Sequence, residues 1–147
     1  MEPHKLPIRI YYEDTDAGGV VYHSNFINFT ERGRTELLRF MGFENKSLHE
    51  NQGILFVVRH ISADYLKPAV LDDLLEVQTI VTQLKNTSLV MKQSIYRNSE
   101  LIFTADVTVV SVSAGSLKPV RIPDGLRGGF QKYLKEIHKQ HDHEPES

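Results

Sequence analysis

Residues 24–42 read SNFINFTERGRTELLRFMG. Bulky apolar side chains and one glycine recur in this stretch every three to four residues, the period of one face of an α-helix. The members of that face are Phe26, Phe29, Gly33, Leu37 and Phe40, flanked by Leu38 and Met41. The charged residues on the other face are Glu31, Arg32, Arg34, Glu36 and Arg39. We therefore expect an amphipathic helix of roughly eighteen residues, close to five turns. Ser24 or Asn25 can cap its start, and Gly42 stands where a helix stops.

Short segments rich in β-branched residues lie on both sides of this helix. They cover residues 6–12 before it and residues 54–66, 74–84, 88–97 and 101–112 after it. Asn98-Ser99 reads as a hairpin turn, and tight turns between consecutive strands indicate an antiparallel sheet. One helix with a wide apolar stripe must lie on that sheet. The sequence thus predicts an α+β fold with five strands, one dominant helix and a modest helix over residues 124–139.

Composition limits the classes of function. The chain has 147 residues, enough for one domain, and its net charge of −2 gives no electrostatic case for binding nucleic acid. It contains no cysteine, which excludes a Cys nucleophile and a thiolate zinc site. The polar start, residues 1–5, has no signal-peptide character, and no apolar run approaches the length of a membrane span. We expect a soluble, cytoplasmic protein without an integral membrane segment.

Residues 11–26 read YYEDTDAGGVVYHSNF, with two acids and two glycines typical of a turn. This run resembles the active-site signature of the 4-hydroxybenzoyl-CoA thioesterase family. It is most similar to the YbgC-type acyl-CoA thioesterases, the branch associated with the Tol–Pal system. Further similar strings cover residues 56–59, 65–69, 71–77 and 87–89, so the resemblance extends over nearly the whole chain. It implies the hotdog fold, a five-stranded antiparallel sheet wrapped around one long central helix.

The resemblance also implies a function. It indicates a hydrolase that cleaves acyl-CoA, or an acyl carrier protein thioester, to the free acid and the thiol. The family needs no cofactor and no metal, and it forms a homodimer or homotetramer. We expect residues 1–139 to form the single hotdog thioesterase domain and residues 140–147 a polar, disordered tail.

The chemistry of thioester hydrolysis suits a glycine loop followed by a helix. A carboxylate can act as base or nucleophile, and free N–H groups at a helix start can stabilise the oxyanion. No G-x-S-x-G elbow is present, as expected of a mechanism without a Ser-His-Asp triad.

The resemblance assigns catalytic roles to Asp16, to the backbone N–H and side chain of His23, and to Tyr12. It assigns substrate binding to Gly19, Tyr22 and Asn25. Asn25 can also fix the loop, and Gly18 with Gly19 would let the backbone approach the substrate closely.

Structural interpretations compete with several of these roles. Asp14 and Asp16 can cap turns, with Asp14 the more structural of the two. Tyr12 can be a core aromatic residue, and Glu31 a solvated or ion-paired one. The tail residues His138, His141 and His143 indicate a solvated tail rather than a metal site. The basic residues Arg59, Lys67, Lys85 and Lys92 could meet the phosphates of CoA or simply be surface charges.

Two other functions remain open at this point. A hotdog hydratase or dehydratase could pair His23 with Glu31, although the D-T-D-x-x-G-G string argues against it. A non-enzymatic subunit could bind acyl-CoA or acyl carrier protein and scaffold an envelope or lipid-synthesis complex.

Overall fold

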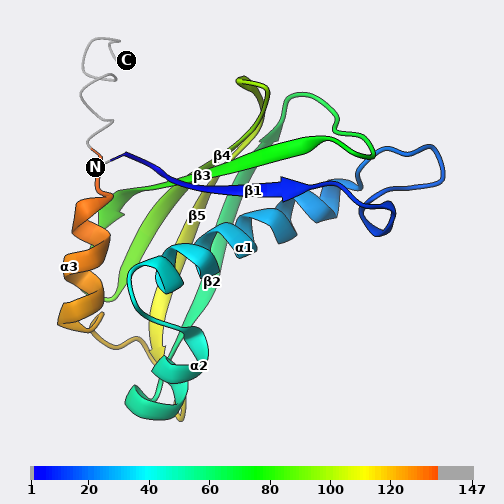
Figure 1. The fold of residues 1–147 in the computed structure, drawn as a ribbon. Coiled ribbons are helices and arrows are strands. Elements are labelled where there is room, and N and C mark those ends of the chain that lie inside the picture. The colour runs from blue at the N-terminus through cyan, green and yellow to red at the C-terminus, as the bar shows by residue number, and fades with distance from the viewer. Residues whose placement is uncertain (1, 136–147) are drawn as a thin grey trace.

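The computed structural model describes residues 2–135. One antiparallel sheet has the strand order β1-β3-β4-β5-β2, and α1 (His23–Phe40) lies across one of its faces (Figure 1). The strands are β1 (His4–Arg9), β2 (Ile54–Tyr65), β3 (Leu74–Leu84), β4 (Ser88–Arg97) and β5 (Glu100–Ser113). The α+β class and the hotdog arrangement of five strands and one long helix are confirmed.

Helix α1 has the predicted length of 18 residues and buries Phe26, Phe29, Gly33 and Leu37 against the sheet. Its last residue, Phe40, was predicted on the buried face, but its side chain is 71% exposed. The helix starts one residue before Ser24, and neither predicted cap forms. Tyr22, with φ −60° and ψ 141°, is the capping residue and makes no side-chain cap.

The sheet carries the alternation expected of strands with one buried face. The inward side chains of the two central strands β3 and β4 are all buried; they are Leu75, Val77, Thr79 and Val81 on β3, and Leu89, Met91, Gln93 and Ile95 on β4. The predicted hairpin turn at Asn98-Ser99 is confirmed, since both residues have positive φ (48° and 69°). The pairing of β3, β4 and β5 therefore follows directly from the sequence pattern.

The ends of two predicted elements differ from the structure. The first strand was expected to reach Tyr12, but β1 ends at Arg9 and a short 3-10 helix, η1 (Tyr12–Asp14), follows. The turn forms because the Asp14 carboxylate accepts a hydrogen bond from the Tyr11 N–H at 2.9 Å. The final helix, α3 (Asp124–Lys132), ends earlier than predicted because the Lys135 N–H then bonds to the Val81 carbonyl of β3. Residues 136–139 and the predicted tail 140–147 lie outside the described residues.

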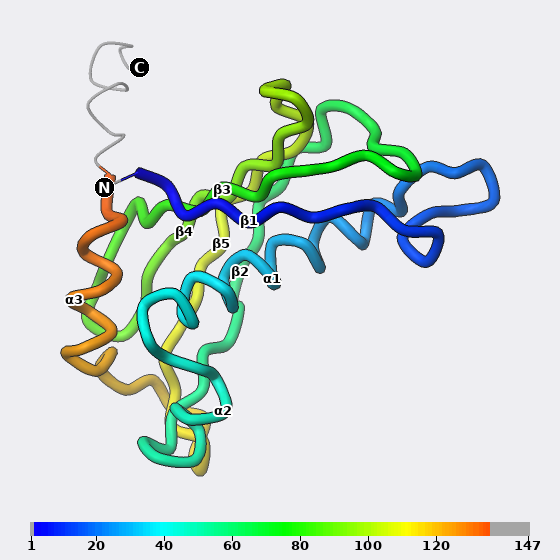
Figure 2. Tube along the Cα trace, in the orientation of Figure 1, coloured from blue at the N-terminus to red at the C-terminus, as the bar shows by residue number. Residues whose placement is uncertain are grey.

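Two short elements, α2 (Asn45–Ser47) and η2 (Leu48–Gln52), connect α1 to β2. At the opposite end of α1, the loop that joins β1 to α1 projects from the sheet (Figure 2). The loop between β2 and β3 runs beside it, with a hydrogen bond from the Val21 N–H to the Ala69 carbonyl at 2.9 Å. The residues of the glycine loop are thus supported by a segment some fifty positions later in the chain.

Candidate active site

Residues 14–22 form a tight hairpin between η1 and α1. The Asp16 N–H donates to the Val20 carbonyl at 2.9 Å, and the Gly19 N–H donates to the Asp16 carbonyl at 3.0 Å. Gly19 has φ +81°, a conformation that glycine adopts without the strain a side chain would cause. A bond from the Tyr22 N–H to the Asp14 carbonyl, 3.2 Å long, closes the hairpin. Asp16 therefore lies at the start of the turn. His23, the first residue of α1, directly follows the hairpin.

The Asp16 carboxylate has one engaged and one free oxygen. Its Oδ1 accepts hydrogen bonds from the N–H groups of Gly18 and Val20 at 2.8 and 3.1 Å. Its side chain is exposed, and its Oδ2 accepts no hydrogen bond from residues 2–135. Asp16 thus caps its own turn, as the structural interpretation of the sequence expected. The two bonds also fix the carboxylate, which leaves Oδ2 free to meet water or a substrate.

The first turn of α1 presents unpaired donors. The N–H groups of His23 and Ser24 donate no hydrogen bond within the described part of the chain, whereas the Asn25 N–H bonds to the Tyr22 carbonyl at 3.0 Å. Free N–H groups and the positive end of the dipole make the start of an 18-residue helix a site for developing negative charge. The geometry supplies the donors that an oxyanion requires.

Asn25 and Asp14 tie this helix start to the hairpin. The Asn25 side-chain amide donates to the Asp14 Oδ1 at 3.1 Å and to the Asp14 carbonyl at 3.2 Å. Asp14 is 5% exposed, and its second oxygen accepts the Tyr11 N–H. Asp14 is therefore structural, as predicted, and the Asn25 side chain fixes the loop. The predicted contact of Asn25 with substrate stays a prediction.

The imidazole of His23 lies against β2. Its ring stacks on that of Tyr65 with the centroids 4.3 Å apart, and the Tyr65 hydroxyl donates to the His23 carbonyl oxygen at 3.0 Å. Tyr65 also makes an edge contact with Phe26, which stacks on Phe103 of β5. An aromatic cluster thus joins the start of α1 to the end of β2. No hydrogen bond links the His23 and Asp16 side chains within residues 2–135.

The predicted tyrosines are surface residues. Tyr12 is 80% exposed, and its hydroxyl makes no hydrogen bond within the described residues. Its carbonyl accepts the Thr15 N–H and hydroxyl at 3.0 and 2.9 Å, so the backbone of Tyr12 helps to build the loop. Tyr22 is 49% exposed next to the free N–H groups of α1. Roles for both side chains in catalysis or binding stay predictions.

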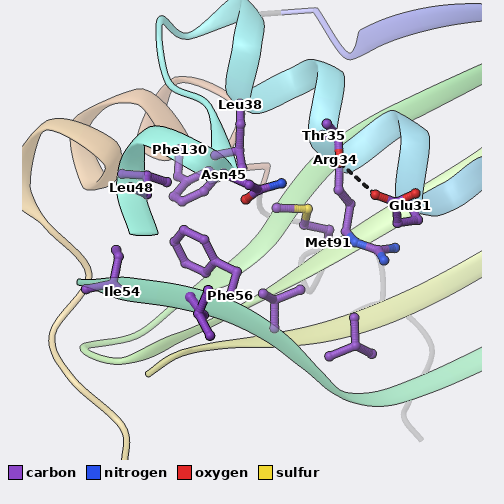
Figure 3. Close-up of a pocket in the computed structure, with 13 residues that line it drawn as sticks. Glu31, Arg34, Thr35, Leu38, Asn45, Leu48, Ile54, Phe56, Met91 and Phe130 are labelled. Atoms are coloured by element: carbon purple, nitrogen blue, oxygen red, sulfur yellow. Dashed lines mark hydrogen bonds between the residues drawn. The ribbon is translucent and has the colours of Figure 1, made fainter. Parts of the chain in front are cut away.

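A pocket of about 260 Å³ opens farther along α1, between that helix and β2. In Figure 3, Glu31 and Arg34 lie together on α1 at one end of it, and Leu48 and Phe130 lie at the other. Phe56 and Met91 contribute apolar walls. The volume is just below the range of about 300–1,000 Å³ that small-molecule sites occupy. None of the residues that the resemblance assigns to catalysis or substrate binding lines this pocket, and Glu31, named for the alternative hydratase, does.

Arg34 is more buried than the sequence pattern predicted. It was expected on the solvent face of α1, but it is half-buried, and its Nη1 donates to the Gln93 side-chain oxygen at 3.0 Å. Gln93 is fully buried and donates in turn to the Thr30 carbonyl and the Thr79 hydroxyl. Burial lowers the pKa of Arg34, and the Glu31 carboxylate acts in the opposite direction. A polar network therefore lies beneath α1 and reaches the pocket.

The remaining charged residues have ordinary surroundings. Glu31 is exposed and accepts a hydrogen bond from the Thr35 hydroxyl at 2.9 Å, while Lys67 forms an ion pair with Glu100 at 2.7 Å.

Within residues 2–135, no group of three His, Cys, Asp or Glu side chains is placed to hold a metal ion. In the same part of the chain, no helix has the length and apolarity that a membrane span needs. The three tail histidines lie outside the described residues.

Comparison with known proteins places these observations in a family context. The model of the thioesterase superfamily matches residues 18–104. The acyl-CoA thioesterase YbgC of Haemophilus influenzae is 44% identical over 125 residues, which cover 85% of this chain and 92% of the relative. The acyl-CoA thioester hydrolase YbgC of Escherichia coli O6:H1 is also 44% identical, with coverage of 87% and 96%. The crystal structure of a probable thioesterase from Bartonella henselae shares 37% identity at a TM-score of 0.79, covering 82% of this chain and 99% of that one.

Proposed function

The chain belongs to the thioesterase superfamily, and from this premise we propose how its glycine loop and the start of α1 hydrolyse an acyl-CoA thioester. The chain is an acyl-CoA thioesterase of the YbgC type. One observation carries the proposed mechanism. A single hairpin brings together a carboxylate and the first N–H groups of a long helix, and one carboxylate oxygen and two of these N–H groups have no partner among residues 2–135.

The N–H groups of His23 and Ser24 bind the thioester carbonyl oxygen and stabilise the negative charge that develops on it. Asp16 acts through Oδ2 in one of two ways. As general base it takes a proton from water while the water oxygen attacks the carbonyl carbon. As nucleophile it attacks that carbon itself, forms a mixed anhydride and expels the CoA thiolate, and water then cleaves the anhydride. Both routes yield the free acid and CoA.

We assign the far end of a long acyl chain to the pocket between α1 and β2. Glu31, at the near end of the pocket, lies eight residues after His23, or about 12 Å along the helix axis. Short acyl groups would therefore end before the pocket, and only longer chains would enter it. The lining supports an aliphatic or aryl chain, because Phe56, Leu38 and Met91 are apolar.

We further propose that two copies associate through β2. This strand has 12 residues, pairs with β5 on one side only and forms a free edge of the sheet. Val57, Val58 and Leu66 expose apolar side chains on or directly after it. Long free edges are normally covered in stable proteins, and a second copy would cover this one. We propose that the protein forms a homodimer, or a homotetramer of two such pairs, in the cytoplasm. Two further proposals rest on the resemblance alone: activity on acyl carrier protein thioesters, and an association with the Tol–Pal system.

The decisive experiment compares wild type with Asp16→Asn in a thiol-release assay across acyl-CoAs of increasing length. Asp106→Asn is the matched control, since Asp106 is an exposed aspartate on β5, away from the loop. We expect Asp16→Asn to lose at least about 100-fold in kcat. Wild-type turnover by a folded Asp16→Asn protein would refute the assignment. Rapid quench of a single turnover followed by mass spectrometry distinguishes the two routes, because only the nucleophilic route joins the acyl group covalently to Asp16.

A further inference from the structure

A partly buried ion-pair cluster lies where β4 turns into β5. Arg97, the last residue of β4, donates through Nη1 to the Asp73 carboxylate at 3.0 Å and through Nη2 to Glu100 at 3.2 Å. The side chains of Arg97 and Asp73 are only 22% and 20% exposed. Exposed ion pairs contribute little to stability. The pair of Arg97 and Asp73 is largely removed from solvent, and the Arg97 guanidinium bonds to both carboxylates through separate nitrogens.

The cluster holds the loop between β2 and β3 from one side. The same Nη1 of Arg97 donates to the Pro68 carbonyl at 2.8 Å, near the start of that loop. Asp73, at its end, accepts the Val70 N–H at 3.0 Å. One guanidinium thus bonds to both ends of residues 68–73 and fixes the distance between them.

The other side of the same loop builds the candidate active site. The Val21 N–H donates to the Ala69 carbonyl at 2.9 Å, and the Leu71 N–H donates to the Gly19 carbonyl at 3.0 Å. Val20 and Val70 form an antiparallel bridge between these two contacts. Residues 19–21 are the part of the hairpin that separates Asp16 from the first N–H groups of α1.

We propose that Arg97 is a positioning residue of the thioesterase site: it clamps residues 68–73, and these hold residues 19–21 so that Asp16 and the start of α1 keep their relative geometry. The proposal rests on the function proposed above for Asp16 and α1. Arg97 itself touches neither reacting group. An arginine suits this task because its planar guanidinium carries several N–H donors that can bond to two carboxylates and a carbonyl at once. A lysine carries all its donors on one nitrogen and cannot span the same three acceptors.

The test replaces Arg97 with Met, which keeps an unbranched apolar stem and removes the donors, and with Lys, which keeps the charge. Loss of positioning lowers kcat rather than substrate binding. We expect Arg97→Met to lose about tenfold in kcat with KM within about twofold of wild type. Arg97→Lys should retain more of the wild-type kcat than Arg97→Met. The control is Arg121→Met, because Arg121 also bonds to an amide oxygen and a carboxylate, those of Asn86 and Asp124.

Hydrogen exchange supplies a readout independent of activity. The N–H groups of Val21 and Leu71 should exchange faster in Arg97→Met, while peptides from β4 and β5 keep their protection. Unchanged kcat in a folded Arg97→Met protein would refute the proposal, and so would a uniform loss of protection across the sheet, which would indicate general destabilisation. Wild-type protein without any thioesterase activity would instead refute the proposed function, whatever the exchange data show of the clamp.

Discussion

The ring of His23 stacks on the ring of Tyr65, and the Tyr65 hydroxyl donates a hydrogen bond to the His23 carbonyl oxygen at 3.0 Å. Both contacts join the first residue of α1 to the last residue of β2. They hold the helix start from outside the glycine loop. The imidazole is therefore engaged in packing, which favours the His23 backbone N–H, rather than its side chain, as the catalytic group.

The first prediction concerns His23→Ala. The substitution removes the stacking contact but keeps the N–H group, so kcat should fall by about tenfold or less, in line with the roughly 0.5–1.5 kcal/mol of an aromatic pair. The thiol-release assay measures this, with Tyr65→Phe as control because it keeps the ring and removes the hydroxyl. A loss in His23→Ala as large as that of Asp16→Asn would assign the imidazole a direct role.

The second prediction concerns Asn25→Ala. Both hydrogen bonds from Asn25 to Asp14 are lost, and the buried Asp14 carboxylate keeps the Tyr11 N–H as its donor among the described residues. The free energy of unfolding should fall by about 1–3 kcal/mol, because a buried acceptor loses its partner. Asn51→Ala is the control, since Asn51 is an exposed asparagine in η2, away from the hairpin. Equal urea midpoints for the two variants would contradict the anchoring role.

The features that the sequence predicted well are those that depend on local patterns. The alternation of Leu89, Met91, Gln93 and Ile95 predicted β4 and its buried face, and the Asn98-Ser99 pair predicted the hairpin. These signals require no knowledge of distant residues. The resemblance in residues 11–26 then supplied the candidate site, because the chemistry and its supporting turn lie in one short segment.

The features that the sequence could not predict depend on contacts between distant segments. Arg34 follows the polar side of the helical pattern, and its burial depends on Gln93, 59 residues later. Arg97 reads as an ordinary strand end, and its link to Pro68 depends on how two loops meet. Polar residues on strand faces that are otherwise apolar and inward, such as Gln93 on β4 and Thr79 on β3, were a signal that could have located the buried network.

The third prediction concerns that network. Gln93→Leu removes one hydrogen-bond partner each from Arg34, from the Thr30 carbonyl and from the Thr79 hydroxyl beneath α1. Unsatisfied buried polar groups should lower the free energy of unfolding by about 1–3 kcal/mol, measured by urea denaturation. Gln83→Leu, at an exposed position of β3, should change it by less than about 0.5 kcal/mol. Wild-type stability of Gln93→Leu would show that the core needs no polar network there.

The fourth prediction concerns pH. Burial lowers the pKa of His4, although Glu36 raises it, and the His4 Nδ1 is buried without a partner within the described residues. The pKa in the folded state lies below the ordinary value of 6.5, so the stability linked to neutral His4 is fully present above 6.5. It is lost as the pH falls through the lower, folded-state value. The melting temperature of wild type should therefore decrease more between about pH 7.5 and 5.5 than that of His4→Leu. Parallel curves for the two proteins would refute the link.

The fifth prediction tests the pocket as the acyl site. Val58 lines it, and Val57, the next residue of β2, does not. Because neighbouring strand residues point to opposite faces, Val58→Phe should fill the pocket while Val57→Phe leaves it open. Both variants alter the same sheet edge, so any effect on subunit association should be shared.

Assays with acyl-CoAs of different chain length then test whether the acyl group lies in this pocket. A short acyl group ends well before Glu31, about 12 Å along α1, and should be hydrolysed equally by Val58→Phe and wild type. A long chain must enter the pocket, and its kcat/KM should fall about tenfold or more, an energy comparable to one or two displaced methylene groups. If Val58→Phe and Val57→Phe affect long acyl-CoAs equally, the acyl group lies outside this pocket.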